Sequence, residues 1–143
     1  MTPVVLDASV GAKWFLPAEG EPLAQEALVI LQAYSAGNVR LIVPDLFWAE
    51  VGNLLWKAIR QGRCTKTVAD SGLTSLRELN LPTTPSVELI GAAFEIALAY
   101  DRTVYDSLYV ALAVQSQGQF VTADERLANA VAARLPVKWL GAA

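Results

Sequence analysis

Thr103-Val104-Tyr105-Asp106-Ser107-Leu108-Tyr109-Val110-Ala111-Leu112-Ala113-Val114 is the stretch from which the fold of this 143-residue chain can be worked out. Every residue from Leu108 to Val114 is apolar, and a helix that is apolar on all faces must be surrounded by protein. Asp106 lies near the first turn of this predicted helix, where the positive end of the helix dipole favours an anion. An unpaired buried charge is costly, so we expect Asp106 to face an enclosed space with a cation, a protonated partner or a hydrogen-bond network.

Two predicted strands on either side of this helix end in an acidic residue. Val4-Val5-Leu6 is followed by Asp7, and the strand 119–122 is followed by Ala123-Asp124. Short apolar runs of this kind are typical of parallel strands buried on both faces. Ligands of such sheets bind outside the carboxyl ends of the strands, which favours a functional site at both acids. The alternative is that Asp7, Ser9 or Asp124 caps the helix that follows it.

The remaining elements follow from helical periodicity and from Gly and Pro breakers. We predict helices at 10–16, 23–36, 46–60, 65–79, 85–100 and 125–134, and further strands at 40–43, 79–82 and 137–140. The alternation of strands and helices predicts an α/β fold, a three-layer α/β/α sandwich with a central parallel sheet. The length predicts a single domain over residues 1–143.

A third candidate acid, Glu50, lies on the predicted helix 46–60, where Asn53 and Lys57 share its face. The helix pattern alone favours a solvent-facing glutamate beside a lysine. The same helix begins a local positive stripe in which no acid occurs between Glu50 and Asp70. Its members are Lys57, Arg60, Arg63 and Lys66. These residues either bind phosphate groups or are cations that suit a helix C-terminus.

The composition restricts the chemistry that the chain can perform. It has no histidine and one cysteine, Cys64, which excludes an internal disulfide, a cysteine-cluster zinc site and the usual general base. Four acids that converge at one sheet edge would repel each other unless a cation lies between them. Carboxylate oxygens suit Mg²⁺ or Mn²⁺, and the expected chemistry is phosphoryl transfer through an activated water.

The overall charge and hydropathy bear on location and partners. The net charge is −3, which argues against an extended nucleic-acid surface. The early Asp7 argues against a signal peptide and the sequence contains no long apolar run, so we expect a cytoplasmic protein. An apolar content of 54% suggests apolar surface that a second copy or another protein covers.

Four segments in order resemble the acidic motifs of the PIN-domain ribonucleases, and of the VapC-type toxins in particular. They are Val5-Leu6-Asp7-Ala8-Ser9, Pro44-Asp45-Leu46-Phe47-Trp48-Ala49-Glu50-Val51-Gly52-Asn53, Tyr105-Asp106-Ser107-Leu108-Tyr109 and Val121-Thr122-Ala123-Asp124. The resemblance covers nearly the whole chain. It implies the PIN-domain fold and a metal-dependent endoribonuclease, the toxin of a type II toxin–antitoxin pair.

The same resemblance implies roles for individual residues. Asp7, Glu50, Asp106 and Asp124 match the family's catalytic, metal-binding quartet. Asp7 and Asp106 would be the principal ligands of Mg²⁺ or Mn²⁺, Asp124 would bind directly or through water, and Glu50 would be a ligand or position the water. The implied supporting polar groups are Ser9, Asn53 and Thr122.

The resemblance also implies partners, which are an RNA substrate, a small antitoxin protein and a second copy in a homodimer. No membrane is implied. In such pairs the tail of the antitoxin lies in an apolar groove beside the active site. Four aromatic residues fit such a groove, although each taken singly is better explained as a core residue. They are Trp14, Phe15, Trp48 and Trp56.

Two other functions remain open from the sequence. One is a non-catalytic, Mg²⁺-binding module similar to a receiver domain, which needs an acceptor aspartate at a middle strand end. Asp45 has that position but is better explained as a helix cap. The other is a phosphatase with Asp7 as nucleophile. That chemistry needs a second aspartate two residues later, where this chain has Ser9.

Overall fold

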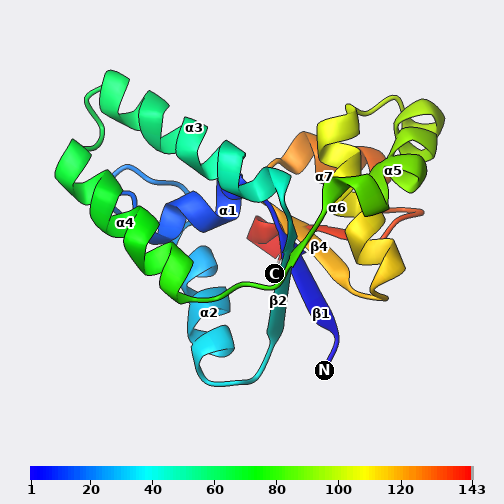
Figure 1. Ribbon diagram of the computed structural model, residues 1–143, viewed down its shortest axis with the longest axis horizontal. Coiled ribbons are helices and arrows are strands. Elements are labelled where there is room, and N and C mark those ends of the chain that lie inside the picture. Colours follow the sequence, from blue (N-terminus) through cyan, green and yellow to red (C-terminus); the bar gives the residue numbers. More distant parts are fainter. Residues whose placement is uncertain (143) are drawn as a thin grey trace.

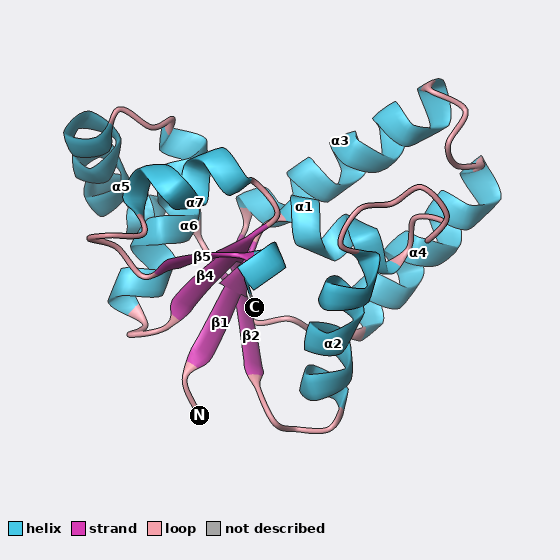
Figure 2. Ribbon diagram, turned by 180° about the vertical axis from the view of Figure 1, so that it is seen from behind, coloured by secondary structure: helices cyan, strands magenta, loops and turns pink. Residues whose placement is uncertain are grey.

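The computed structural model describes residues 1–142 and contains a five-stranded sheet whose paired strands all run parallel (Figures 1 and 2). The strand order is β3-β2-β1-β4-β5, which places the predicted strand after the N-terminus at the centre. The strands are β1 (Pro3–Leu6), β2 (Arg40–Pro44), β3 (Thr83–Thr84), β4 (Gln119–Thr122) and β5 (Val137–Trp139).

Helices cover both sides of this sheet, with α1 to α4 on one side and α5 to α7 on the other (Figures 1 and 2). They are α1 (Ala8–Gly11), α2 (Ala24–Ser35), α3 (Leu46–Arg60), α4 (Lys66–Glu78), α5 (Ser86–Tyr100), α6 (Val104–Gln115) and α7 (Glu125–Val131), with short 3-10 helices η1 (Ala12–Trp14) and η2 (Leu140–Ala142). The predicted three-layer sandwich is confirmed. None of the helices described is both long and apolar enough to cross a membrane.

The order of the strands reverses direction at β1. The chain passes from β1 through β2 to β3 at one edge, then returns to place β4 and β5 on the other side of β1. Neighbouring strands β1 and β4 therefore come from opposite ends of the chain, with Leu6 in register with Val121. In an open parallel sheet, a crevice forms at the carboxyl ends of the strands where the order reverses. Asp7 follows β1 directly at this place.

Helix α6 packs against the sheet as its apolar sequence predicts. Residues 107–113 are all buried, and the ring of Tyr109 stacks on Phe120 of β4 with a centroid separation of 5.3 Å. The helix begins with a side-chain cap, because the Thr103 hydroxyl accepts a hydrogen bond of 3.1 Å from the amide of Asp106. Val114, in the last turn, is exposed, so the burial of the apolar run ends one residue earlier than expected.

The predicted strand at 79–82 is wrong. Leu79 ends α4, Asn80 has left-handed backbone, and the strand comes later, at Thr83–Thr84. Its pairing with β2 is preceded by a bond of 3.0 Å from the Val43 amide to the Pro82 carbonyl. The apolar signal of this segment came from Leu81, which is buried in the core next to the strand and not within it.

The helices near the two ends of the chain also differ from their predicted bounds. The helix expected at 10–16 begins at Ala8 and tightens into η1 after Gly11. A Cβ atom at Gly11 would lie 2.8 Å from the Phe47 ring, so the glycine permits the close approach of α1 to α3. The helix expected at 125–134 ends at Val131, because the chain turns there toward β5.

Asp45 caps a helix, but not the one that follows it in the sequence. Its side chain makes no cap bond to α3. It accepts a 3.0 Å bond from the Ser86 amide and another bond from the Ser86 hydroxyl, at the start of α5. These bonds hold the pKa of the Asp45 carboxyl below its ordinary value. The end of β2 is thereby joined to a helix on the other side of the sheet.

Candidate active site

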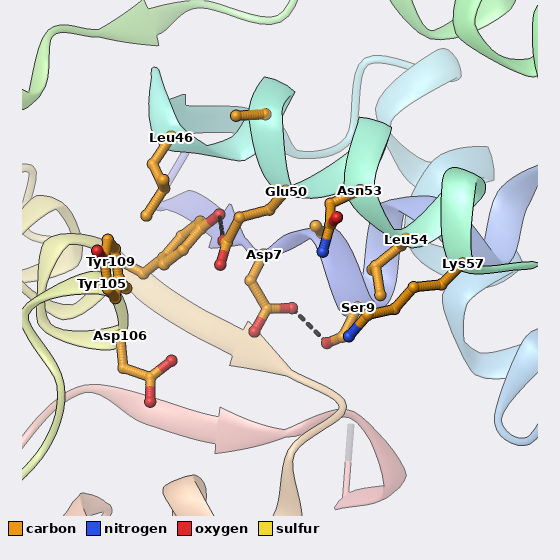
Figure 3. A pocket seen from close by; sticks show the side chains of 12 residues that line it. Asp7, Ser9, Leu46, Glu50, Asn53, Leu54, Lys57, Tyr105, Asp106 and Tyr109 are labelled. Atoms are coloured by element: carbon orange, nitrogen blue, oxygen red, sulfur yellow. Dashed lines mark hydrogen bonds between the residues drawn. The ribbon is translucent and has the colours of Figure 1, made fainter.

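An acid-lined cavity of about 460 Å³ lies at the carboxyl end of β1 (Figure 3). Three of the four predicted acids line it, namely Asp7 after β1, Glu50 on α3 and Asp106 on α6. The other lining residues are Ala8, Ser9, Leu46, Ala49, Asn53, Leu54, Lys57, Tyr105 and Tyr109. The cavity is therefore built where three separate elements meet at the reversal of strand order.

Asp7 is held by hydroxyl groups on both sides of the β1–β4 junction. One carboxylate oxygen accepts a bond from the Ser9 hydroxyl, and the other accepts a bond of 2.7 Å from the Thr122 hydroxyl. Each hydroxyl is itself fixed, because Ser9 accepts from the Ala123 amide and Thr122 accepts from the Asp124 amide. Both predicted supporting hydroxyls thus lie against Asp7. The alternative of an Asp7 side-chain cap does not hold, since its carboxylate makes no cap bond.

Each carboxyl group at the cavity has its pKa raised by burial and by the negative charge of a neighbouring acid. Burial and, to a smaller extent, the charge of Glu50 raise the pKa of Asp7 from 3.8 to about 6, against the lowering effect of the Ser9 and Thr122 bonds. Burial also raises the pKa of Glu50, as does the charge of Asp106. Asp106 has its pKa raised by burial and by the charge of Asp124. The four acids therefore share one electrostatic environment.

Asp124 differs from the other three acids in its position. Its side chain is exposed and is not part of the cavity wall. One of its oxygens accepts a bond of 3.1 Å from the Leu127 amide, so it caps α7, as the alternative from the sequence predicted. That cap uses one carboxylate oxygen only, and the charge still reaches Asp106.

Glu50 does not face water beside Lys57, which was the alternative favoured by the helix pattern alone. It is part-buried, and the Tyr109 hydroxyl donates a hydrogen bond to its carboxylate. Burial and this bond raise the pKa of the tyrosine, so the hydroxyl keeps its proton. Sequence analysis did not assign Tyr109 a role. The available signal was its place one turn after Asp106, on the same face of α6.

Arg102 is a second residue that sequence analysis passed over as part of a turn. It is part-buried at the turn before α6, where its guanidinium bonds to the carbonyl of Tyr100. Its charge lowers the pKa of Asp106 and partly offsets the effect of burial. A cation therefore lies beside the acids on the α6 side of the cavity.

The four basic residues of the predicted stripe fall into two pairs. Lys57 lines the cavity and extends toward Ser9 in Figure 3, and Arg60 lies over the ring of Trp56 at 5.1 Å from its centre. Arg63 lies 3.8 Å from the carboxylate of Glu21, and Lys66 lies 2.6 Å from that of Asp70. Only Lys57 and Arg60 have their charges available to a ligand.

The four aromatic residues predicted to line an apolar groove differ in their burial. Trp14, Phe15 and Trp48 are part-buried and pack against the core, and Trp14 and Phe15 also line a groove beside α4. The indole nitrogens of Trp14 and Trp48 donate to the Ala27 carbonyl and the Thr83 hydroxyl. Trp56 differs, because 53% of its surface is exposed.

The donor set at the cavity fits a hard divalent cation. All candidate ligands are carboxylate oxygens, and the raised pKa values of Asp7, Glu50 and Asp106 reflect a need for positive charge. Within residues 1–142 no three acids stand close enough to hold one ion directly. That spacing agrees with Mg²⁺, which is usually bound by one or two carboxylates and completes its shell with water and substrate phosphate.

We expect Tyr109→Phe to raise the pKa of Glu50 while leaving the fold in place. The change removes the hydroxyl that donates to the carboxylate, and the remaining ring can still stack on Phe120. Carbon-detected NMR titration of the glutamate carboxyls measures the effect. Tyr105→Phe, on an exposed tyrosine that also lines the cavity, is the control and should leave the Glu50 titration unchanged. An unchanged titration in Tyr109→Phe would show that the bond is not formed in solution.

The fold and the acid-lined cavity at the strand reversal are those of a PIN domain. A model of the family described as PIN domain matches residues 4–133, and the chain belongs to this family. The resemblance seen in the four sequence motifs is therefore confirmed.

One related protein and two solved structures are similar to this chain over most of its length. Ribonuclease VapC3 of Pyrobaculum aerophilum is 35% identical over 128 residues, which cover 88% of this chain and 92% of the relative. The crystal structure of PAE2754 from Pyrobaculum aerophilum superposes with a TM-score of 0.66 at 21% identity, over 99% of this chain and 85% of the other. Mycobacterium tuberculosis VapC20, described as a sarcin-ricin loop cleaving toxin, superposes with a TM-score of 0.64 at 15% identity, over 92% and 95% of the two chains.

Proposed function

We propose that this protein is a metal-dependent endoribonuclease and the toxin of a type II toxin–antitoxin pair. The observation that carries the proposal is the cavity at the end of β1, where Asp7, Glu50 and Asp106 converge and Asp124 adds its charge. The relationship to Ribonuclease VapC3 supports the choice of RNA as substrate.

In the proposed reaction, water is added across a phosphodiester bond, and the P–O ester bond breaks as the new P–O bond forms. Bound Mg²⁺ or Mn²⁺ would lower the pKa of a water and stabilise negative charge on the phosphate. Asp7 and Asp106 would hold the ion, and Asp124 would do so through water. Ser9 and Thr122 fix both oxygens of Asp7, and Tyr109 fixes Glu50, which would orient the attacking water.

Asn53 and Lys57 would contact the RNA rather than the ion. Both line the cavity from α3, on the same side as Glu50 (Figure 3). An amide and an ammonium group can each donate to phosphate oxygens. Arg102, in the turn before α6, would partly balance the negative charge of Asp106.

Two kinds of protein partner belong to the proposal. The first is a second copy of this chain, supported by an exposed apolar stripe along one face of α5. Its members are Val87, Ile90, Phe94 and Leu98. The second is a small antitoxin, supported by a groove of about 410 Å³ between Trp14, Phe15 and α4. A cytoplasmic location is proposed with them.

No observation favours the two alternative functions. A receiver-like module would need an acceptor aspartate in the cavity, whereas Asp45 at the end of β2 is bonded to Ser86. A phosphatase of this kind needs a second aspartate two residues after its nucleophile, whereas Ser9 has that position and donates a hydrogen bond to Asp7.

The test is incubation of the purified, partner-free chain with a pool of structured RNAs in Mg²⁺, Mn²⁺ or EDTA. We expect discrete cleavage products with either ion and none with EDTA. The activity must co-elute with the chain in gel filtration, which excludes a contaminating nuclease. Absence of cleavage by folded, partner-free protein with both ions would overturn the proposed function.

A further inference from the structure

We propose that a single-stranded segment of RNA leaves the acidic cavity along α3, and that one of its bases stacks on the pair formed by Trp56 and Arg60. The proposal rests on the ribonuclease function proposed above. It adds a contact outside the acidic cavity, the stacking of one unpaired base on the exposed ring of Trp56 beside Arg60.

The first support is a line of polar side chains on one face of α3. Glu50, Asn53, Lys57 and Arg60 follow one another at intervals of three, four and three residues, so they lie above one another along the helix. The line begins with a carboxylate in the cavity and continues with an amide and an ammonium group, which line the same cavity. It ends with a guanidinium one turn further out. A strand whose scissile phosphate lies at the acids could place its neighbouring phosphates along this line.

The second support is that Lys57 and Arg60 form no ion pair with a carboxylate. Among residues 1–142, the carboxylates form ion pairs with Lys13, Arg63 and Lys66, and with neither Lys57 nor Arg60. Phosphates are bound by cations that release their counterions, and a cation already held by a carboxylate gains less from a phosphate. Other cations of the chain are also without an ion pair, but Lys57 lines the acidic cavity and Arg60 follows it one turn further along α3. Their charges mark the direction in which a polyanion is attracted.

The third support is the exposed indole of Trp56. More than half of its surface is accessible, and the Arg60 guanidinium lies 5.1 Å from the ring centre, which orients both groups. Aromatic rings and guanidinium planes are the surfaces on which unpaired bases stack. A base inside a continuous duplex has no free face for such a contact. The pair therefore selects an unstacked base near the cleavage site.

The position of Trp56 separates it from the apolar stripe of α5. It lies on α3, while the apolar stripe of α5 lies at the far end of the molecule (Figure 1). The charge beside the two surfaces also differs. Trp56 is accompanied by free cations, which suit a polyanion, whereas the exposed residues of the α5 stripe are all hydrocarbon.

The experiment measures binding in an Asp106→Asn background with Mg²⁺, so that the RNA is not consumed. The probe is a fluorescently labelled, mixed-sequence RNA oligonucleotide, either single-stranded or annealed to its complement. We expect the single strand to bind more tightly, and Trp56→Ala to weaken its binding about tenfold. Trp56→Phe should retain affinity within about threefold but lose most of the quenching of tryptophan emission by RNA. Lys57→Gln should reduce the salt dependence of log Kd by about one ion. The control Lys66→Gln should change neither the affinity for the single strand nor its salt dependence.

Each outcome decides the proposal. The proposal would be overturned if the proteins with Trp56 and with Trp56→Ala bound the single-stranded RNA with equal affinity. It would also be overturned if the protein with Trp56 bound the single strand and the duplex with equal affinity. A Trp56→Ala variant that loses dimer mass or antitoxin affinity and keeps its RNA affinity would overturn it as well, because the face would then bind protein. Cleavage of RNA by the wild-type chain is scored separately. The path along α3 can therefore fail while the nuclease stands.

Discussion

Asp106→Asn is expected to lower the rate of metal-dependent RNA cleavage at least about a hundredfold while the protein stays folded. The substitution keeps the size of the side chain and removes one negative charge from the cavity. A neutral amide is a poor ligand for a hard cation and cannot replace the carboxylate. The start of α6 is preserved, because Thr103 caps the helix through the Asp106 backbone amide and not through its side chain.

Asp101→Asn is the matched control for this variant. It makes the same chemical change five residues earlier, at an exposed residue that ends α5 with left-handed backbone. Asparagine tolerates that conformation, so the fold and the cleavage rate should both stay at the wild-type level. Initial rates with Mg²⁺, and circular dichroism of both variants, measure the difference. Equal rates for Asp106→Asn and Asp101→Asn would contradict a role for Asp106 in the chemistry.

The second large effect concerns stability. Asp7→Asn should stabilise the metal-free protein at neutral pH, although it removes a residue of the site. A pKa of about 6, against an ordinary value of 3.8, means that the folded state disfavours the ionised carboxylate. The difference corresponds to a free energy of about 3 kcal/mol once the group is ionised. Asparagine carries no charge, and its oxygen and nitrogen can still bond to Ser9 and Thr122.

The sign of the pH dependence follows from the raised pKa. The folded state of the wild type binds the Asp7 proton more tightly than the unfolded state does. Its contribution to stability is therefore full below about pH 4 and is lost as the pH rises through about 6. Urea unfolding in EDTA across this range should show a gap that opens in favour of Asp7→Asn. Added Mg²⁺ should close the gap by stabilising the wild type alone. A gap that does not vary with pH would contradict the raised pKa.

The acids could be predicted from the sequence because their positions follow from topology. Asp7 comes directly after a buried strand, and the carboxyl ends of parallel strands meet at one edge, whatever the side-chain details. The alternation of strands with helices was sufficient to predict the three-layer α/β/α sandwich. The one short strand that was misplaced, Thr83–Thr84, has neither the length nor the apolar residues that mark the others.

The bonds between elements could not be predicted in the same way. Tyr109 is buried and stacks on Phe120, as its apolar helix suggests. Its hydroxyl, however, donates a hydrogen bond to Glu50, which lies 59 residues earlier in the chain on α3. Asp45 has the sequence position of a cap for α3 and caps α5 instead. The free or paired state of each cation in the basic stripe depends on acids elsewhere in the chain, such as Glu21. Local patterns contain no information on such partners.

The bond between Thr122 and Asp7 joins residues 115 positions apart, and the strands that bear them are neighbours in the sheet. During synthesis Asp7 leaves the ribosome 115 residues before Thr122, so the site of a nascent chain stays incomplete until β4 has been made. Contacts of such long range form late in folding, since the intervening chain must first be closed into a loop. For the ribonuclease proposed above, a nascent chain without β4 would be inactive toward the RNA of the ribosome that makes it.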